Sequence, residues 1–422
     1  MITISIPSVN GFEALKMFKN HGYNFIKATC DKYDTNLFHV NALLKDIVCM
    51  TGKDAAALFY DPAKFERMRA IPKRVQKTLL GEDGVQTLDG EIHRVRKAMF
   101  MSLMTPQNIS MLMESVRHYW AVYTRKWEHM EKVVLFQEAQ EIFCRAACEW
   151  AGVPLREHEV RQRADDFTAM VDAFGAMGPR HWRGKTARSR TEEWIMAVID
   201  QVHQKKVDPV PGTALHVMLS HAESGTDKMD KRVTAVEVIN ILRPIVAIAY
   251  YVTFAAHALH RHPKIARKLR GNDDEYLEHF TQEVRRFYPF APFTGAMVKD
   301  DFEWNAYEFE RGTLVFLDIY GTNHDPDVWA NPEQFVPERF ETWNGDKFNF
   351  IPQGGGDHAS GHRCAGERIT IEAMKLSVAH LATKMTYDVP DQDLSFSLTR
   401  LPTYPESGFV IHRVTGETPG IL

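Results

Sequence analysis

Phe350-Ile-Pro-Gln-Gly-Gly-Gly-Asp-His-Ala-Ser-Gly-His-Arg-Cys364-Ala-Gly-Glu367 is the stretch that decides the fold. It is a glycine-rich loop that runs directly into a helix-like segment, with Cys364 at the junction. Backbone N–H groups and a helix N-terminus beside a thiol stabilise the thiolate, which is the form of cysteine that binds a metal ion. A lone cysteine is more often a small buried apolar residue, so other motifs have to decide between the two interpretations.

The composition is typical of a globular protein. The chain has 422 residues, of which 44% are hydrophobic and 25% charged, with 51 Lys+Arg against 55 Asp+Glu and a formal net charge of -4. A nucleic-acid-binding protein usually carries a basic stripe, and this sequence has none. We therefore expect no nucleic-acid partner.

The cysteines and the apolar runs bear on the location. There are five cysteines, an odd number, and no set of Cys or His residues has the spacing of a zinc site. The N-terminus lacks the basic and apolar regions of a secretion signal. The strongest apolar run, residues 244–256, is shorter than the roughly 18 residues that span a bilayer. We expect a cytoplasmic protein without a membrane anchor.

Hydrophobic periodicity predicts a helix-rich body. Residues 34–51 alternate in polarity and predict a hairpin, followed by a helix over about 54–60. A 3.6-residue period dominates from about 107 to 269 and returns at 272–288. Helices are predicted near 109–129, 134–152, 156–174, 190–205, 234–261 and 272–288.

The last third of the chain mixes short strands with loops. Residues 296–319 suggest strands with a turn at Arg311-Gly312, and a proline-rich aromatic stretch covers 325–340. A helix should follow Cys364 to about Lys384, with short strands near 386–389 and 407–413. We expect a mainly α (α+β) fold with small β-sheets, and we take residues 1–422 as a single domain.

Arg243 is the most informative charged residue. It lies in a stretch, residues 239–252, that is apolar nearly all round and therefore predicts a buried helix. Pro244 removes one N–H there and should kink the helix. A buried unpaired charge is very costly, so Arg243 needs an anionic partner. Three explanations are open. The charge pairs with an internal Asp or Glu, it reaches bulk water at an end of the helix, or its planar guanidinium holds the carboxylate of a ligand.

Three motifs in a fixed order carry a resemblance to a known family. They are Glu283-x-x-Arg286, the run from Asn323-His-Asp-Pro to Pro337-Glu-Arg-Phe340, and Cys364-x-Gly366. In this order and over nearly the whole chain they resemble the cytochrome P450 superfamily. The resemblance implies haem b (iron protoporphyrin IX) with Cys364 as its axial thiolate ligand. It also implies a structural lock behind the haem that is formed by Glu283, Arg286 and Arg339.

The chain departs from the general superfamily pattern at several positions, and in these departures it is similar to one branch, the fatty-acid peroxygenases. Asp357 replaces an aromatic residue, Ser360 replaces a glycine, and three extra glycines follow Gln353. Oxygen-activating members carry an acid followed by Thr on the long helix, whereas this chain has Arg243-Pro244. Glu237 and Thr253 are each more than a turn away.

This resemblance implies a peroxide-dependent hydroxylation of long-chain fatty acids at the alpha or beta carbon, without an obligatory redox partner. Arg243 would hold the substrate carboxylate, which takes and returns a proton of hydrogen peroxide as general acid–base. Gln86 matches a position that is Gln in hydroxylating members and His in decarboxylating members, so hydroxylation is favoured. Leu80 matches a position that is aromatic in some relatives. Its smaller, flexible side chain lets the substrate sit deeper and favours reaction at the alpha carbon. The catalytic residues would be Arg243, Pro244 and Gln86.

Other positions follow from the same resemblance. Three residues resemble positions that line the substrate pocket: Val171, Phe290 and Phe293. By sequence alone, each is also compatible with a place in the hydrophobic core. His93, Lys97 and His362 resemble residues that face the haem propionates. Three alternatives stay open: a fatty-acid decarboxylase that forms terminal alkenes, a monooxygenase that depends on a redox partner, and a non-catalytic haem–thiolate sensor of lipid or gas.

Overall fold

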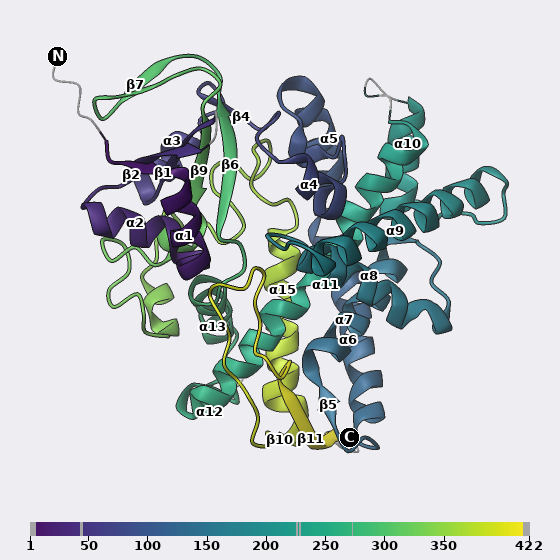
Figure 1. Cartoon of the computed structure of the whole chain (residues 1–422). Coiled ribbons are helices and arrows are strands. Elements are labelled where there is room, and N and C mark those ends of the chain that lie inside the picture. The colour runs from purple at the N-terminus through teal and green to yellow at the C-terminus, as the bar shows by residue number, and fades with distance from the viewer. Residues whose placement is uncertain (1–5, 43–44, 225–226, 228, 272, 417–422) are drawn as a thin grey trace.

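Helices make up most of the molecule, as the periodicity predicted (Figure 1). The computed structural model describes residues 6–42, 45–224, 227, 229–271 and 273–416. The α-helices are α1 Gly11–His21, α2 Phe25–Tyr33, α3 Lys53–Phe59, α4 Lys73–Val75, α5 Gly90–Ser102, α6 Pro106–Trp127, α7 Leu135–Ala151, α8 Val160–Asp172, α9 Pro179–His203, α10 Ala214–Ser224, α11 Lys231–Arg261, α12 Pro263–Leu269, α13 Asp274–Phe287, α14 Ile319–Asn323 and α15 Glu367–Ala379.

A six-stranded sheet lies to one side of the helices, with strand order β1-β2-β3-β9-β6-β4 (Figure 1). Its strands are β1 Ser8–Asn10, β2 Leu37–Ala42, β3 Lys45–Met50, β4 Phe65–Glu66, β6 Phe293–Val298 and β9 Leu314–Asp318. The predicted hairpin is β2 and β3, which pair antiparallel from Leu37↔Met50 onward. β3 also pairs in parallel with β9, with Val48 opposite Val315, and so joins two segments that are far apart in the sequence.

Two small sheets complete the strand set. One contains β10 Met385–Asp388, β11 Val410–Gly416 and β5 Val133–Val134, and the other contains β7 Phe302–Trp304 and β8 Tyr307–Phe309. Small, short sheets of this kind agree with the predicted α+β body.

Helix α11 forms the centre of the main hydrophobic core. It packs against α7, α8, α9, α10, α13 and α15. It begins at the N-cap Asp230, whose side chain accepts the backbone N–H of Val233 at 2.7 Å, and it continues as one helix across Pro244. By length and composition α11 could cross a membrane, but 94% of its apolar window is buried inside the protein. We therefore assign it as a core helix.

Some helix boundaries differ from the prediction. α9 begins at Pro179, about ten residues before the expected start, because Gly178 takes a positive φ of 65° and Pro179 opens the helix. The polar stretch that follows has no strong apolar stripe and so gave no periodic signal. The predicted helical segments also did not include α1, α2, α4, α10, α12 or α14.

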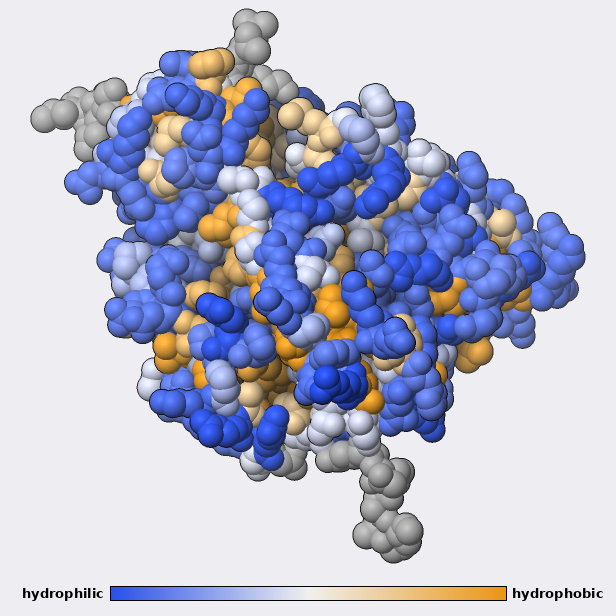
Figure 2. Space-filling model, turned by 60° about the horizontal axis from the view of Figure 1, so that its bottom comes forward, coloured by the Kyte–Doolittle hydropathy of each residue, from blue (hydrophilic) through white to orange (hydrophobic). Residues whose placement is uncertain are grey.

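The surface alternates between charged and apolar regions. Figure 2 shows one face on which hydrophobic residues are visible in hollowed places between hydrophilic ones. Apolar atoms contribute much of any protein surface, so such scattered exposure is ordinary.

Candidate active site

The candidate active site is a cavity of about 420 Å³ between α11 and the loop that carries Cys364. This volume is within the range of small-molecule sites. Its walls come from the turn Gln76–Leu80, from α5 and α11, and from the start of α15. The sequence-predicted residues that line it are Leu80, Gln86, His93, Lys97, Arg243, Pro244, Phe290, His362 and Cys364.

Cys364 lies on the floor of this cavity, three residues before α15. Its backbone N–H donates to the carbonyl of Gln353 at 3.1 Å, and the Gln353 side-chain amide lies 3.7 Å from the Cys364 Sγ. Burial raises the pKa of the Cys364 thiol, and the Gly366 backbone N–H and the charges of Lys97 and Arg285 oppose that shift. The loop therefore supplies the predicted N–H group, but a bound cation is needed to hold the thiolate form.

The residues around Cys364 fit a flat apolar group with acidic substituents, which is the chemistry of haem. A Cβ added at Gly366 would meet no protein atom within 4 Å, so the floor next to the thiol is open. Apolar side chains such as Phe100, Ile245 and Ile248 form the walls. Cationic or hydrogen-bonding side chains stand at one rim, where they can hold carboxylates.

That rim brings together three predicted residues. The rings of His93 and His362 stack with centroids 4.0 Å apart, and His362 Nε2 lies 3.3 Å from an Asp89 carboxylate oxygen. Lys97 Nζ donates to the carbonyl of Arg363. Burial, together with the charges of His362 and Lys97, lowers the pKa of His93 to about 4, so this ring is neutral near pH 7.

Arg67 is a rim residue that the sequence did not reveal. Its guanidinium donates to the carbonyl of Gly295 at 2.7 Å and lies 4.3 Å from the centroid of the Phe59 ring. It lines the cavity although the side chain is buried. Nothing in its local sequence sets it apart from a surface arginine, because only the fold brings β4 and β6 beside the haem-sized space.

Arg243 is buried, with 5% of its surface exposed, and it faces the same cavity. Within the described ranges no carboxylate lies within 4.0 Å of its guanidinium, and its Nη1 has no hydrogen-bond partner. Burial and the nearby charge of Arg188 lower the pKa of Arg243 to about 9, which still leaves it protonated at pH 7. An unpaired cation in this position favours an anionic ligand.

Glu237 is the acidic residue closest to Arg243 along α11, and its carboxylate already has other hydrogen-bond partners. Its carboxylate accepts the backbone N–H of Val85 at 2.8 Å and Arg96 Nη1 at 3.1 Å. Arg96 also binds both oxygens of Asp227, at 2.7 and 2.8 Å. The internal-acid explanation for Arg243 is therefore excluded for the part of the chain that the structure describes.

Asn240 links this buried pair to Gln86. Its Nδ2 donates to Glu237 Oε2 at 2.8 Å and to Gln86 Oε1 at 3.3 Å. Because a carboxylate only accepts, the NH₂ end of Asn240 must face Glu237, and its Oδ1 is left buried without a partner. Sequence reasoning missed Asn240, although its position one turn before Arg243 was an available signal.

The predicted lock residues meet behind the Cys364 loop. Glu283 is fully buried and binds Arg286 through Nε and Nη2 at 2.7 and 2.9 Å, while Arg339 Nε approaches to 3.1 Å. Arg286 also donates to the carbonyls of Asn323 and Pro332. A second pair, Arg285 with Glu367, ties α13 to the first turn of α15 and was not singled out from the sequence.

Two predicted pocket residues lie elsewhere. Phe293 packs against Phe18 and Phe316 beside the large sheet, and Val171 lies against the main core. Neither is among the residues that line the cavity, whereas Phe290 lines it and stacks on Tyr251 with centroids 4.5 Å apart. Thr253 is buried and donates to the carbonyl of Ala249 at 2.7 Å, away from the cavity.

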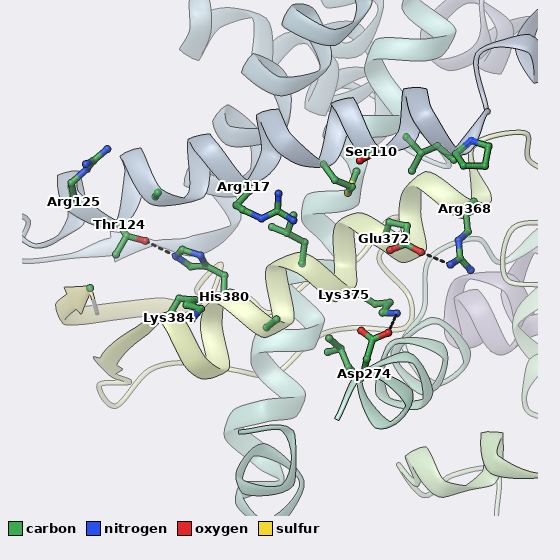
Figure 3. A pocket seen from close by; sticks show the side chains of 18 of the residues that line it. Ser110, Arg117, Thr124, Arg125, Asp274, Arg368, Glu372, Lys375, His380 and Lys384 are labelled. Atoms are coloured by element: carbon green, nitrogen blue, oxygen red, sulfur yellow. Dashed lines mark hydrogen bonds and ion pairs between the residues drawn. The ribbon is translucent and has the colours of Figure 1, made fainter. Parts of the chain in front are cut away.

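A second, larger cavity of about 1330 Å³ opens between α6, α13 and α15 (Figure 3). Charged side chains pair at its wall: Arg368 with Glu372 within α15 at 2.5 Å, and Lys375 of α15 with Asp274 of α13 at 3.2 Å. None of the predicted site residues lines it. Its size alone does not make it the active site, since the chemically distinctive residues gather in the smaller cavity.

Comparison with known proteins adds family and structural matches. The family model described as Cytochrome P450 matches residues 12–412. Cytochrome P450 3A11 of Mus musculus is 26% identical over 224 residues, covering 46% of this chain and 44% of that protein. Cytochrome P450 3A1 of Rattus norvegicus is 26% identical over 215 residues, covering 45% and 41%. The aligned part thus spans less than half the length of these curated relatives.

Solved structures match over nearly the full length. Cytochrome P450SP alpha (CYP152B1) in complex with (R)-ibuprophen has a TM-score of 0.92 and 45% identity, covering 96% of this chain and 98% of that chain. Cytochrome P450EX alpha (CYP152N1) with myristic acid has a TM-score of 0.93 and 42% identity, covering 98% and 100%. A variant of cytochrome P450 OleT in complex with arachidonic acid has a TM-score of 0.93 and 36% identity, covering 98% and 99%.

Proposed function

The chain belongs to the cytochrome P450 family, and from this premise we propose that it is a hydrogen-peroxide-dependent hydroxylase of long-chain fatty acids. The observation that carries the proposal is the buried Arg243 guanidinium, which has no acidic partner among the described residues and faces the cavity floored by Cys364. A fatty-acid carboxylate matches that charge and can accept both N–H groups of the planar fork.

Cys364 would hold the haem iron, and Arg67, His93, Lys97 and His362 would hold its acidic substituents. When bound, haem supplies the iron that reacts with hydrogen peroxide and the substrate C–H bond. The apolar walls of the cavity exclude water from that space. The lock of Glu283, Arg286 and Arg339 keeps the polypeptide behind the loop rigid.

Arg243 sets the position of the substrate. It pins the carboxylate at the α11 wall, so the carbons that follow the carboxylate lie closest to the reacting centre and proximity selects them. The pinned carboxylate also takes and returns the proton of hydrogen peroxide, a role for which no Asp or Glu among the described residues lines the cavity. Glu237 is held by Arg96, and Thr253 donates to the backbone of its own helix.

Gln86 supports hydroxylation over alkene formation. Its Oε1 accepts from Asn240, so its amide N–H groups remain as donors toward the cavity. An amide does not exchange a full proton near pH 7, whereas histidine does. With Leu80 leaving room at the same wall, we propose the alpha carbon as the main site, with the beta carbon second.

The complexes of related structures support the substrate class, because one holds myristic acid and another arachidonic acid. Independence from a redox partner and a cytoplasmic location belong to the same proposal. All five cysteines are free in the structure, which suits a reducing compartment.

The test uses purified haem-loaded protein, hydrogen peroxide and myristate, with no reductase present. We expect 2-hydroxymyristate as the main product by mass spectrometry. Arg243→Ala removes the partner of a buried carboxylate, at a cost of about 3–5 kcal/mol, which lowers kcat/KM for myristate by about 100-fold or more. Arg125→Ala, on the exposed side of α6, is the matched control and should retain wild-type values.

The alternatives give different results in the same assay. A redox-dependent monooxygenase would show no peroxide-driven turnover, a decarboxylase would release a terminal alkene, and a sensor would bind myristate without product. Full turnover by Arg243→Ala would refute the carboxylate-anchoring mechanism.

A further inference from the structure

A patch at the start of α9 combines exposed apolar side chains with unbalanced positive charge. We define the α9 patch as Arg74, Met177, Arg180, His181, Trp182, Arg183, Lys185 and Arg400. Met177 is 69% exposed and Trp182 67%, and both are large apolar residues. Large apolar side chains scattered singly on a surface are ordinary, but these two lie close together in the sequence and beside a cluster of cations, a combination that is typical of an interaction surface.

The cations of the patch greatly outnumber its acids. Arg180, Arg183 and Arg400 all pair with the single carboxylate of Asp172, at 3.1, 3.5 and 2.8 Å. Within the described ranges no acid lies within 4.0 Å of Arg74 or Lys185. Three of the five cations therefore share the Asp172 carboxylate and two have no acid nearby, which gives these six groups a net charge of about +4.

Independent contacts place these residues together. Arg74 donates to the carbonyl of Ala176, next to Met177, and Arg180 donates to the carbonyl of Leu401, next to Arg400. His181 lies within the electrostatic reach of both Arg74 and Lys185. The patch is thus one continuous surface built from three separate parts of the sequence.

Stability does not explain this arrangement. Like charges repel, and cations in the first turns of a helix are disfavoured by its dipole. The first turn of α9 contains no acidic residue to compensate. A surface that costs folding stability is expected to be retained for binding.

The patch lies next to the roof of the active-site cavity. The turn Gln76–Leu80 packs against both α8 and α9, which Figure 1 shows side by side. Leu80 at the end of this turn lines the cavity, and Arg188 of α9 donates to the carbonyl of Leu79 at 3.2 Å. A ligand held on the patch is therefore close to the elements that cover the cavity.

We propose that the α9 patch docks the protein on the surface of an anionic phospholipid bilayer. Trp and other large apolar side chains insert at the boundary between headgroups and acyl chains, and flanking cations bind anionic headgroups. Two exposed apolar residues with several cations near them match that interface. The docking is peripheral and reversible, because the long apolar helix α11 is buried in the core. The binding itself does not depend on the proposed substrate.

The test is co-sedimentation of the haem-loaded protein with vesicles of phosphatidylcholine, with or without phosphatidylglycerol. We expect binding only to the anionic vesicles, falling as salt screens the charges. Arg183→Glu with Lys185→Glu should weaken that binding at least tenfold. Met177→Ser with Trp182→Ser should also weaken it, because the apolar insertion is lost.

The matched control is Arg117→Glu with Arg125→Glu, which makes the same change of charge on α6, where Figure 3 labels both residues. It should bind like the wild type, and thermal unfolding should show that all variants fold. Equal weakening by the control pair, or no binding by the wild type, would overturn the proposal. Unchanged binding of the Met177→Ser, Trp182→Ser variant would also overturn it, and would indicate a purely electrostatic surface for an acidic macromolecule. No outcome involves turnover, so failure here is distinct from failure of the proposed function.

Discussion

At the scale of single residues, the two charged side chains Glu237 and Arg243 of α11 have different roles. Arg96 neutralises Glu237 on one side, and this leaves Arg243 to the cavity on the other. Asn240 stands between them and holds Gln86 through its Nδ2. The site thus depends on a residue whose amide has only one orientation compatible with its neighbours.

Asn240→Ala should lower kcat for myristate while leaving its KM nearly unchanged. The substitution removes the donor that positions Gln86 but does not touch the Arg243 guanidinium that binds the carboxylate. Loss of one such bond is worth about 1 kcal/mol, so kcat should fall roughly fivefold to tenfold. Steady-state kinetics with varied myristate and peroxide provide the measurement.

Thr253→Ala is the matched control on the same helix, since its hydroxyl donates to the carbonyl of Ala249 within α11. It should keep wild-type kcat. A larger loss in Thr253→Ala than in Asn240→Ala would contradict the assignment and favour an acid–alcohol mechanism.

At the scale of elements, buried ion pairs hold α13 against the segments around the haem loop. Glu283 forms ion pairs with Arg286 and Arg339. Arg286 also donates to backbone carbonyls of Asn323 and Pro332, in the segment before the Cys364 loop. Helix periodicity predicted α6, α7, α11 and α13 because each buries an apolar stripe. It missed α10, although Leu215, Met218 and Leu219 have helical spacing, and it missed the first part of α9, where the polar sequence has no strong apolar stripe.

Glu283→Gln should destabilise the protein by about 3–5 kcal/mol, because it leaves the buried Arg286 and the half-buried Arg339 without their counter-charge. Glu338→Gln is the comparison, since Glu338 pairs with Lys268 on the surface, where such a pair is worth about 1 kcal/mol or less. Denaturant unfolding of both variants measures the difference. Equal destabilisation would show that the cluster is not a structural lock.

At the scale of the whole molecule, buried histidines make stability depend on pH. Burial and the nearby Arg261 lower the pKa of His257 to about 4, below the ordinary value of about 6.5. The unfolded chain therefore binds a proton at this residue between pH 6.5 and 4 that the folded chain does not bind. Stability from this group is complete above pH 6.5 and is lost as pH falls through that window.

His257→Gln should flatten the pH dependence of unfolding between pH 6.5 and 4, while its amide can still bond the Tyr288 hydroxyl that His257 contacts at 2.8 Å. The difference in unfolding free energy between wild type and variant should change by up to about 1.4 kcal/mol per pH unit in that range. Comparing the two proteins cancels other titrating groups, including Asp318, whose pKa burial raises to about 7. A constant difference across the window would refute the assignment.

The sequence by itself determined the family, the thiol that would hold the haem and the unusual Arg243-Pro244 pair, because these depend on residue identity and order along the chain. It also determined most long helices, since their apolar spacing is local. Only the tertiary structure decided that Arg243 has no acidic partner within the described ranges. Glu237 is on the same helix, but Arg96 comes from α5, 141 residues earlier, to neutralise it. The pairing of buried charges depends on which side chains of different elements come into contact, and residue spacing along one helix does not predict those contacts.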